Sequence, residues 1–379
     1  MIFPSDTYKR MTSSPGGMKF IHEVIARSIK LKNEGKEIVD CGLGESSHGL
    51  LAKVIEAGME ALKKDEFYYV RPTQGLVELR AEISRQISKE FQLSVDSENV
   101  IVTPGAELGI DLVFKSILNP GDEVVIFDPF FIPFATIAIT YGARPVFVDT
   151  FENGFLPSLK LMKKKISKKT KIIILNSPNN PTGRVFNKKL VEEITFFAKE
   201  RKIYLLSDET YCFFDFEKIF FSPFNIYPEG TIVVRSFSKQ YSMMGYKVGY
   251  IVSSTKIANY IKALQIPGWA APRISSLMAL AALKSSNPQS VIENYESKRD
   301  NLYKGLNEFG LVDYLPEGAF YFYLKCPSGN SLNFALELAD KGLLVIPAFS
   351  TKNTHVRLSY GAIEKEQIPK ILDAIESVL

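Results

Sequence analysis

The sequence predicts an α/β protein with a mostly parallel sheet between helices, together with a smaller α+β domain. Apolar, β-branched runs recur between about residues 99 and 250, and segments with helical spacing separate them. The runs are apolar throughout rather than alternating with polar residues. A strand that is apolar on both sides is buried on both faces, as in a parallel sheet covered by two layers of helices.

Six apolar runs are the expected strands: Val100–Thr103, Glu123–Phe127, Pro145–Val148, Lys171–Leu175, Ile203–Leu206 and Thr231–Arg235. Amphipathic segments such as Ala106–Leu118 and Asn187–Lys202 are the expected helices between them. Ligands of such sheets bind at the carboxyl ends of the strands. We therefore expect the chemistry of this protein directly after these runs.

The C-terminal part has a different pattern and predicts the smaller domain. A long helix is expected over Ser290–Phe309, strands over Ala319–Lys325, Leu343–Pro347 and His355–Ser359, and a closing helix from about Ile363. The N-terminal helix expected near Met18–Asn33 joins this domain. The predicted division is a large domain over residues 46–285 and a small domain formed by the two chain ends, 1–45 and 286–379.

The composition is that of a globular protein, with 379 residues, 46% of them hydrophobic. Its 46 basic and 42 acidic residues give a net charge of only +4, which argues against a dedicated nucleic-acid surface. The three cysteines have no C-x-x-C spacing, and the three histidines show no metal-like or triad-like pairing. We expect neither a disulfide framework nor a metal site, and a reducing compartment fits.

The first residues, Met1–Asp6, do not show a basic segment followed by an apolar one. The most apolar stretch runs from Phe130 to Tyr141 and is interrupted by Pro133. Such a stretch is too short to cross a membrane. The expectation is a soluble cytoplasmic protein without a membrane partner.

Polar clusters directly follow three of the predicted strands. They are Asn176–Gly183, Ser207–Tyr211 and Ser236–Gln240, the last continuing to Gly245–Gly249. Taken singly, each has an ordinary structural explanation, as a turn, a helix cap or a surface lysine. Three of them at successive strand ends predict a ligand site.

The side chains of these clusters match the needs of one cofactor chemistry. The Asp208 carboxylate can pair with a pyridinium nitrogen, and the Lys239 amine can form an imine. The phenol of Tyr211 and the amide of Asn180 can hold a ring oxygen. Three further groups are suited to a phosphate: the hydroxyls of Ser236 and Ser238 and the ammonium of Lys247.

These motifs resemble those of the fold-type I pyridoxal-phosphate enzymes, specifically the class I/II aminotransferases. The resemblance extends from Asp40–Glu45 to Val356–Tyr360, with Asn-Pro-Thr-Gly, Asp-x-x-Tyr and Ser-x-Ser-Lys in the family's order and approximate spacing. It implies pyridoxal 5'-phosphate as cofactor and a large domain with a seven-stranded type of sheet. It also implies an amino acid donor, a 2-oxo acid acceptor, and a homodimer with active sites at the subunit interface.

The resemblance assigns roles to the matching residues. Lys239 is the expected catalytic residue, which holds the cofactor as an internal aldimine and then carries a proton between the substrate Cα and the cofactor. The cofactor alternates with its pyridoxamine-phosphate form. Asp208 keeps the ring nitrogen protonated, while Tyr211 and Asn180 hydrogen-bond the phenolic oxygen.

The phosphate is expected at the start of a helix, where the backbone N–H groups of Gly105, Ala106 and Glu107 are available. Phe131 matches the aromatic residue that stacks on the ring. Because other phenylalanines are close in the sequence, simple core packing is the alternative for Phe131.

Three residues are the expected substrate contacts. Arg357 matches the arginine that binds the α-carboxylate, for which a guanidinium offers two parallel hydrogen bonds. Gly44 brings its backbone close to the same substrate, and Asn180 contacts both substrate and cofactor.

The chain departs from the family pattern at several points. Lys247 replaces the usual arginine at the phosphate and lacks its planar fork. Glu107 stands where a small or amide residue is usual, so only its backbone N–H is assigned. Tyr69 is preferred over Tyr68 as the tyrosine that reaches the phosphate of the neighbouring subunit. The segment Leu344–Val356 is shorter than expected, which points to an unusual side-chain specificity.

Alternatives to an aminotransferase remain at this stage. The same residues can serve a carbon–sulfur β-lyase or a related eliminating enzyme, and the fold can also be kept as a binding module without turnover. Histidinol phosphate and aromatic, branched or acidic amino acids are all open as substrates. Arg273 is a candidate for an acidic side chain, and a surface ion pair is its equally good alternative.

Overall fold

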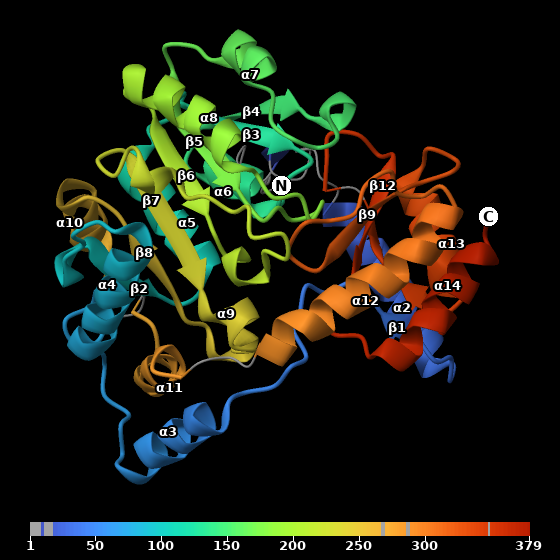
Figure 1. The fold of residues 1–379 in the computed structure, drawn as a ribbon, viewed down its shortest axis with the longest axis horizontal. Coiled ribbons are helices and arrows are strands. Elements are labelled where there is room, and N and C mark those ends of the chain that lie inside the picture. The colour runs from blue at the N-terminus through green and yellow to red at the C-terminus, as the bar shows by residue number, and fades with distance from the viewer. Residues whose placement is uncertain (1–8, 11–17, 267–269, 286–288, 348) are drawn as a thin grey trace, which may run out of the picture.

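The computed structural model describes residues 9–10, 18–266, 270–285, 289–347 and 349–379. Within this part of the chain, seven strands form a sheet in the order β2-β8-β7-β6-β5-β3-β4 (Figure 1). The strands are β2 (Val100–Thr103), β3 (Glu123–Asp128), β4 (Arg144–Asp149), β5 (Thr170–Asn176), β6 (Tyr204–Asp208), β7 (Thr231–Ser236) and β8 (Gly249–Val252).

The sheet is mostly parallel, as predicted. All neighbouring strands from β7 to β4 pair in parallel, whereas β8 pairs antiparallel with both β2 and β7. The six predicted strands are present with ends shifted by two residues at most. The seventh strand, β8, was not predicted, because its four residues begin at the last glycine of the Gly245–Gly249 motif.

Both faces of the sheet are buried, because successive residues of each strand point into different cores. In β5, Ile172 and Ile174 pack into one core, while Ile173 and Leu175 pack into another on the opposite face. Helices α5 (Ala106–Ile117), α6 (Pro133–Thr140) and α10 (Thr255–Leu264) contribute to the first core. The opposite face packs against α7 (Leu159–Lys165) and α8 (Lys188–Glu200), and nearer β2 against α3 (Ala52–Lys63), α4 (Val77–Phe91) and α11 (Arg273–Leu283).

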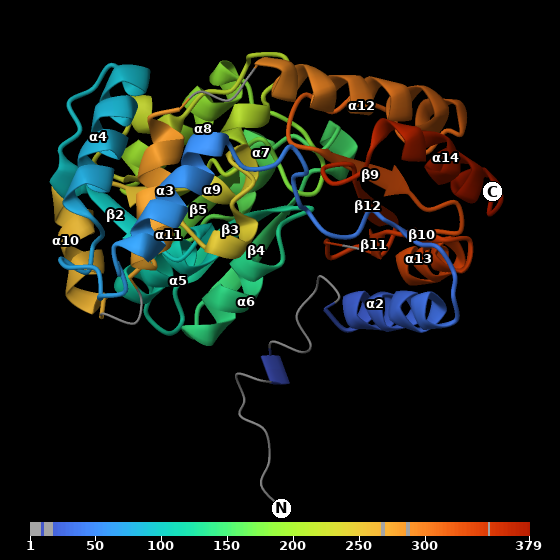
Figure 2. The same cartoon turned by 90° about the horizontal axis from the view of Figure 1, so that it is seen from below.

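A second structural unit lies beside this sheet and is built from the two ends of the chain (Figure 2). It contains the antiparallel sheet β11-β12-β9 and the parallel pair β1-β10. The elements are α2 (Met18–Asn33), β1 (Val39–Asp40), α12 (Gln289–Glu308), β9 (Tyr321–Lys325), α13 (Ser331–Asp340), β10 (Leu343–Leu344), β11 (Ile346–Pro347), β12 (His355–Ser359) and α14 (Ile368–Glu376). The expected strand Leu343–Pro347 is split, because its two halves pair with different partners.

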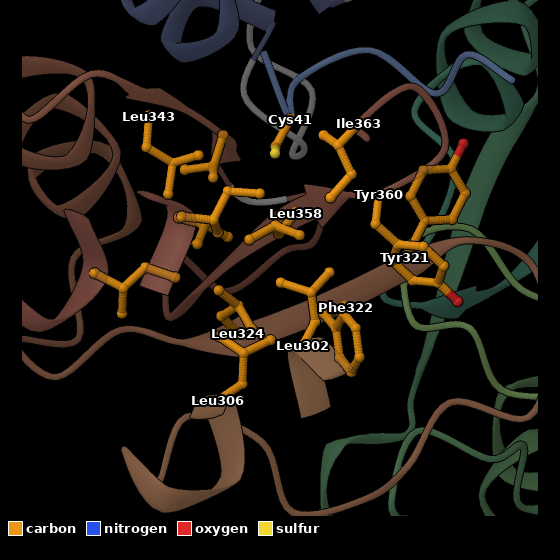
Figure 3. Close-up of a cluster of buried hydrophobic side chains, with 14 of the residues drawn as sticks. Cys41, Leu302, Leu306, Tyr321, Phe322, Leu324, Leu343, Leu358, Tyr360 and Ile363 are labelled. Carbon is orange, nitrogen blue, oxygen red and sulfur yellow. The ribbon is translucent and has the colours of Figure 1, made fainter. Parts of the chain in front are cut away.

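The second unit has its own apolar core. Leu302 and Leu306 of α12 pack against Leu324 of β9 and Leu358 of β12 (Figure 3). Figure 3 also shows the ring of Tyr321 at one edge of this core. The core therefore holds β9 and β12 in place. These two strands carry Tyr321 and Arg357, whose side chains face the larger unit.

All three cysteines, Cys41, Cys212 and Cys326, are free thiols. In the described ranges, no helix combines the length and the apolar character needed to cross a membrane. A search of the same residues finds no cluster of three or more histidine, cysteine or acidic side chains that could hold a metal ion.

The close approach of β8 to the start of α5 gives a first prediction. A Cβ at Gly249 would lie 2.6 Å from the backbone carbon of Gly105 and 2.7 Å from the nitrogen of Ala106. We expect Gly249→Ala to lower the free energy of unfolding by about 1–3 kcal/mol in a urea titration, since the backbone must move apart. Gly245→Ala is the matched control, because a Cβ there has nothing within 4 Å. Equal stability of the two variants would contradict this packing.

Candidate active site

Three neighbouring strands end at one cavity. Asn176 ends β5, Asp208 ends β6 and Ser236 ends β7, and all three border a cavity of about 300 Å³. The cavity brings together every predicted site residue except Tyr69: Gly44, Gly105, Ala106, Glu107, Phe131, Asn180, Asp208, Tyr211, Ser236, Ser238, Lys239, Lys247 and Arg357. The polar residues that follow these strand ends therefore line one cavity.

Lys239 lies on the short helix α9 (Phe237–Gln240), which begins directly after β7. The helix is capped by Ser236, whose Oγ accepts a hydrogen bond of 3.1 Å from the backbone N–H of Ser238. The Lys239 Nζ donates a hydrogen bond to the carbonyl oxygen of Gly44. Burial, together with the nearby charge of Arg357, lowers the pKa of Lys239 to about 8. The neutral, nucleophilic fraction of this amine near physiological pH is therefore much larger than that of an ordinary lysine, although the protonated form remains in the majority.

Asp208 is the buried acid of the cavity. Burial raises the pKa of Asp208 to about 6, and hydrogen bonds from Thr210 act in the opposite direction. The backbone N–H and the hydroxyl of Thr210 donate to Oδ1 of Asp208 over 3.1 Å and 2.6 Å. A cationic ring nitrogen beside this carboxylate would favour its ionised form, since an opposite charge offsets the cost of burial.

Arg357 of β12 forms hydrogen bonds to both structural units. Its Nη1 donates to Oδ1 of Asn180 over 3.0 Å, and its Nη2 donates to the carbonyl of Gly42 over 2.6 Å. The Nε atom is buried and has no hydrogen-bond partner among the described residues. Buried donors nearly always find an acceptor. An acceptor from a ligand, such as a carboxylate, suits this position.

The guanidinium of Arg357 is held between two aromatic rings. Its carbon lies 4.6 Å from the ring centre of Tyr321 and 4.3 Å from that of Phe349. The hydroxyl of Tyr321 lies 2.5 Å from the hydroxyl of Tyr211. Tyr211, which the sequence assigned to a ring oxygen of the cofactor, thus forms a hydrogen bond to the second structural unit.

One end of the cavity is suited to a phosphate. Gly105 begins α5 with a φ of 85°, and no side chain caps the first turn of this helix. The Nζ of Lys247 lies 4.0 Å from the point that a Cβ on Gly105 would occupy. A helix N-terminus with free N–H groups and a nearby ammonium attracts anions.

Phe131 both lines the cavity and packs on the core. Its ring meets the ring of Phe134 edge to face, with the centres 5.5 Å apart. The structure therefore accommodates both interpretations that the sequence left open for Phe131.

Tyr69 lies outside the cavity of its own chain and is 70% exposed. It borders a separate surface pocket together with Phe67, Tyr68 and Arg273. Arg273 forms an ion pair with Glu66. Of the two alternatives for Arg273, the ion pair is the one that the structure contains.

Six lining residues were missed by the sequence reasoning: Leu43, Ile110, Asn176, Thr210, Tyr321 and Phe349. Thr210 carried a usable signal, because a threonine two residues after an aspartate commonly donates to its carboxylate. Tyr321 and Phe349 carried none, because each belongs to a segment whose apolar pattern reads as core.

Comparisons with known proteins agree on one family. Residues 36–375 match the family model described as aminotransferase class I and II. An aspartate aminotransferase of Sulfurisphaera tokodaii is 32% identical over 99% of both chains. An aspartate/prephenate aminotransferase of Thermus thermophilus is 31% identical over 94% of both. The crystal structure of the Thermotoga maritima aspartate aminotransferase superposes with a TM-score of 0.93 at 29% identity, covering 99% of each chain.

The fold and the cavity define the class of protein as a fold-type I aminotransferase, an enzyme type that depends on pyridoxal phosphate. The chain belongs to the class I and II aminotransferase family. The residues present fit the family's cofactor, since one cavity holds an amine of lowered pKa, a buried acid and an anion-binding helix end.

The lowered pKa of Lys239 gives a prediction for pH dependence. An amine reacts with an aldehyde only in its neutral form, so the neutral fraction falls as the pH drops below the pKa. We expect the rate of covalent attachment of pyridoxal phosphate to the cofactor-free protein to rise with pH, with a midpoint near pH 8, and to level off at higher pH. Stopped-flow absorbance measures this rate, with Lys239→Ala as the unreactive control. A midpoint near the ordinary lysine value of about 10.4 would contradict the burial argument.

Proposed function

We propose that the protein transfers the amino group of an α-amino acid to a 2-oxo acid, with pyridoxal phosphate in the cavity and Lys239 as the catalytic residue. One observation carries this proposal. The amine of Lys239 lies in the same cavity as a buried carboxylate, Asp208, and an arginine with an unpartnered buried donor, Arg357. This set can hold a cofactor ring and a substrate carboxylate at the same time.

Pyridoxal phosphate would supply an aldehyde that bonds to amines and a ring that accepts the electron pair of the substrate Cα–H bond. Asp208 would hold the proton on the ring nitrogen, while Tyr211 and Asn180 donate to the ring oxygen. Phe131 would pack on the ring face. The proposed phosphate contacts are the backbone N–H groups of Ala106 and Glu107, the hydroxyls of Ser236 and Ser238, and the Lys247 ammonium. The expected contact from the N–H of Gly105 is not available, because this group donates to the carbonyl of Thr103 over 2.8 Å.

Lys239 would have two roles in the reaction. Its Nζ would hold the cofactor aldehyde covalently before the substrate binds. Once free, the same Nζ would take the proton from the substrate Cα. A pKa of about 8 suits both roles, because proton transfer is most efficient when the pKa lies near the working pH.

The substrate would be positioned by the second structural unit. Arg357 binds the α-carboxylate, and the backbone of Gly44 and the side chain of Asn180 lie beside it. The proposed division into a large domain, 46–285, and a small domain from 1–45 and 286–379 is supported by the separate cores of the two units. Residues 1–8 and 11–17 of the small domain lie outside the described ranges.

We further propose a cytoplasmic protein that acts as a homodimer. The three free thiols suit a reducing compartment. An exposed apolar surface supports the dimer, because Met59 and Leu62 of α3 are 53% and 65% exposed and continue toward the aromatic residues at 67–69. In the dimer, Tyr69 would reach the phosphate site of the neighbouring subunit.

The amino-transfer proposal predicts a two-stage colour change. Certain amino acids should convert the absorbance of the bound aldehyde cofactor to that of its amine form, and a 2-oxo acid should restore it. Arg357→Gln should lower kcat/KM for the best amino acid roughly 10-fold to 100-fold, since charge-assisted hydrogen bonds contribute about 1.5–3 kcal/mol. Steady release of pyruvate and ammonia from cystathionine without an oxo acid would instead establish the β-lyase.

The dimer proposal predicts different effects at two adjacent tyrosines. We expect Tyr69→Phe to weaken retention of pyridoxal phosphate about 10-fold, because one hydrogen bond to a charged group is lost. Tyr68→Phe is the matched control and should retain the cofactor. Equilibrium dialysis measures retention, and analytical ultracentrifugation verifies that both variants remain dimers. A loss with Tyr68→Phe alone would reverse the assignment, and a monomeric wild type would overturn it.

A further inference from the structure

The cavity has a limited set of positive charges. Among its described lining residues, the cations are Lys239, Lys247 and Arg357. Under the proposed function, Lys239 serves the cofactor aldehyde and Lys247 the phosphate. Arg357 then remains for one carboxylate. Each of its two Nη atoms donates one hydrogen bond, to Asn180 and to Gly42, and its buried Nε atom has no partner among the described residues. The donors that remain on one guanidinium suit a single carboxylate.

Arg273 does not line the cavity of its own chain. It borders a different pocket and is paired with Glu66. A second carboxylate on the substrate would therefore find no unassigned cation among the described lining residues. Leaving a charged group without a partner in a partly buried site is unfavourable.

The cavity wall also carries a negative charge. Glu107 lies in the first turn of α5, its side chain is exposed, and it borders the cavity. An acidic side chain is favourable in the first turn of a helix, because the helix dipole is positive there. A substrate with a second carboxylate would meet this like charge, which raises the cost of binding.

The group next to the carboxylate-binding arginine is apolar. The ring of Phe349 lies against the guanidinium of Arg357 and borders the cavity. It also packs with Ile132 and Ile346 in a small cluster between the two structural units. A substrate held at Arg357 therefore lies beside an aromatic surface.

The backbone of Phe349 is held in an unusual conformation. Its φ is 57°, in the left-handed region that bulky residues rarely adopt. Its carbonyl accepts a hydrogen bond of 2.8 Å from the N–H of Phe130, which fixes the segment to the larger unit. Strain of this kind persists at sites where the surroundings hold a side chain in one place. The aromatic wall is thus a positioned feature of the cavity.

We infer that this site selects amino acids with an uncharged, apolar side chain and discriminates against those with a second carboxylate, with Glu107 and Phe349 as the specificity-determining residues. The inference rests on the proposed function. It separates this chain from the aspartate aminotransferases that it resembles, whose names specify an acidic substrate.

The test compares two unreactive carboxylates on the protein loaded with pyridoxal phosphate. Isothermal titration calorimetry gives the dissociation constants of 3-phenylpropanoate, with one carboxylate and an apolar end, and maleate, with two carboxylates. We expect 3-phenylpropanoate to bind at least 10-fold more tightly. Glu107→Lys should strengthen maleate binding at least 10-fold, and the isosteric Glu107→Gln should give a smaller gain, because it removes the charge without reversing it.

A second variant distinguishes the contribution of the Phe349 ring from that of the Glu107 charge. Phe349→Ala should weaken 3-phenylpropanoate about 10-fold and leave the constant for maleate within about 3-fold. Cofactor content is measured for each variant, so that every constant refers to loaded protein. A variant that fails to fold leaves the comparison of the two ligands on the wild type as the deciding result.

Two outcomes would overturn the inference. Maleate binding as tight as that of 3-phenylpropanoate in the wild type would mean that a cation, for example from the partner subunit, serves a second carboxylate. A preference for lysine over leucine in the spectral titration would show that Glu107 recruits a cationic side chain. In either case the colour change with amino acids and its reversal by oxo acids still support amino transfer, whereas their absence removes the proposed function itself.

Discussion

The parallel register of β5, β6 and β7 is the constraint on which the site depends. Asn176 pairs with Asp208, and Asp208 pairs with Val234, so the three strands finish at the same edge of the sheet. Hydrogen bonds of the ladder and burial on both faces hold this register, because a shift of one residue would turn apolar side chains into the wrong core. The polar segments that follow the strands therefore converge, and Lys239 lines the same cavity as Asp208 without a long loop.

A small number of buried polar contacts then join this edge to the second structural unit. Arg357 bonds to Asn180, and Tyr321 meets Tyr211 hydroxyl to hydroxyl. Lys239 bonds to the carbonyl of Gly44. Contacts in a low dielectric are costly to leave unmade, so they define how the two units face each other. The proposed catalytic amine and the proposed substrate arginine are oriented by the same network.

Much of the fold could be predicted, because its causes are local. Runs such as Lys171–Leu175 are apolar along their whole length, and this pattern is typical of strands between two helix layers. Strand β8 was missed because it has only four residues, which is too short for a recognisable hydrophobic pattern, and no turn sequence separates it from the preceding motif. The split between β10 and β11 was missed for a different reason, since the choice of partner strand is decided by the tertiary structure.

The site was predictable where chemistry and position coincide in the sequence, as for Asp208 and Lys239. Residues that only the tertiary structure brings into the site could not be predicted. Phe349 belongs to a short apolar segment, and only the structure brings its ring onto Arg357. The lowered pKa of Lys239 likewise follows from burial and from Arg357, a residue more than a hundred positions away. Tyr69 stays a prediction, because its proposed contact lies in a second subunit.

The most direct test of the account is to locate the covalent bond between protein and cofactor. The protein is loaded with pyridoxal phosphate, treated with sodium borohydride to make the bond permanent, digested, and analysed by mass spectrometry. The account predicts the added mass of the reduced cofactor on Lys239. Modification of another lysine in its place, or a protein that binds the cofactor without any covalent bond, would contradict the assignment on which the proposed function stands.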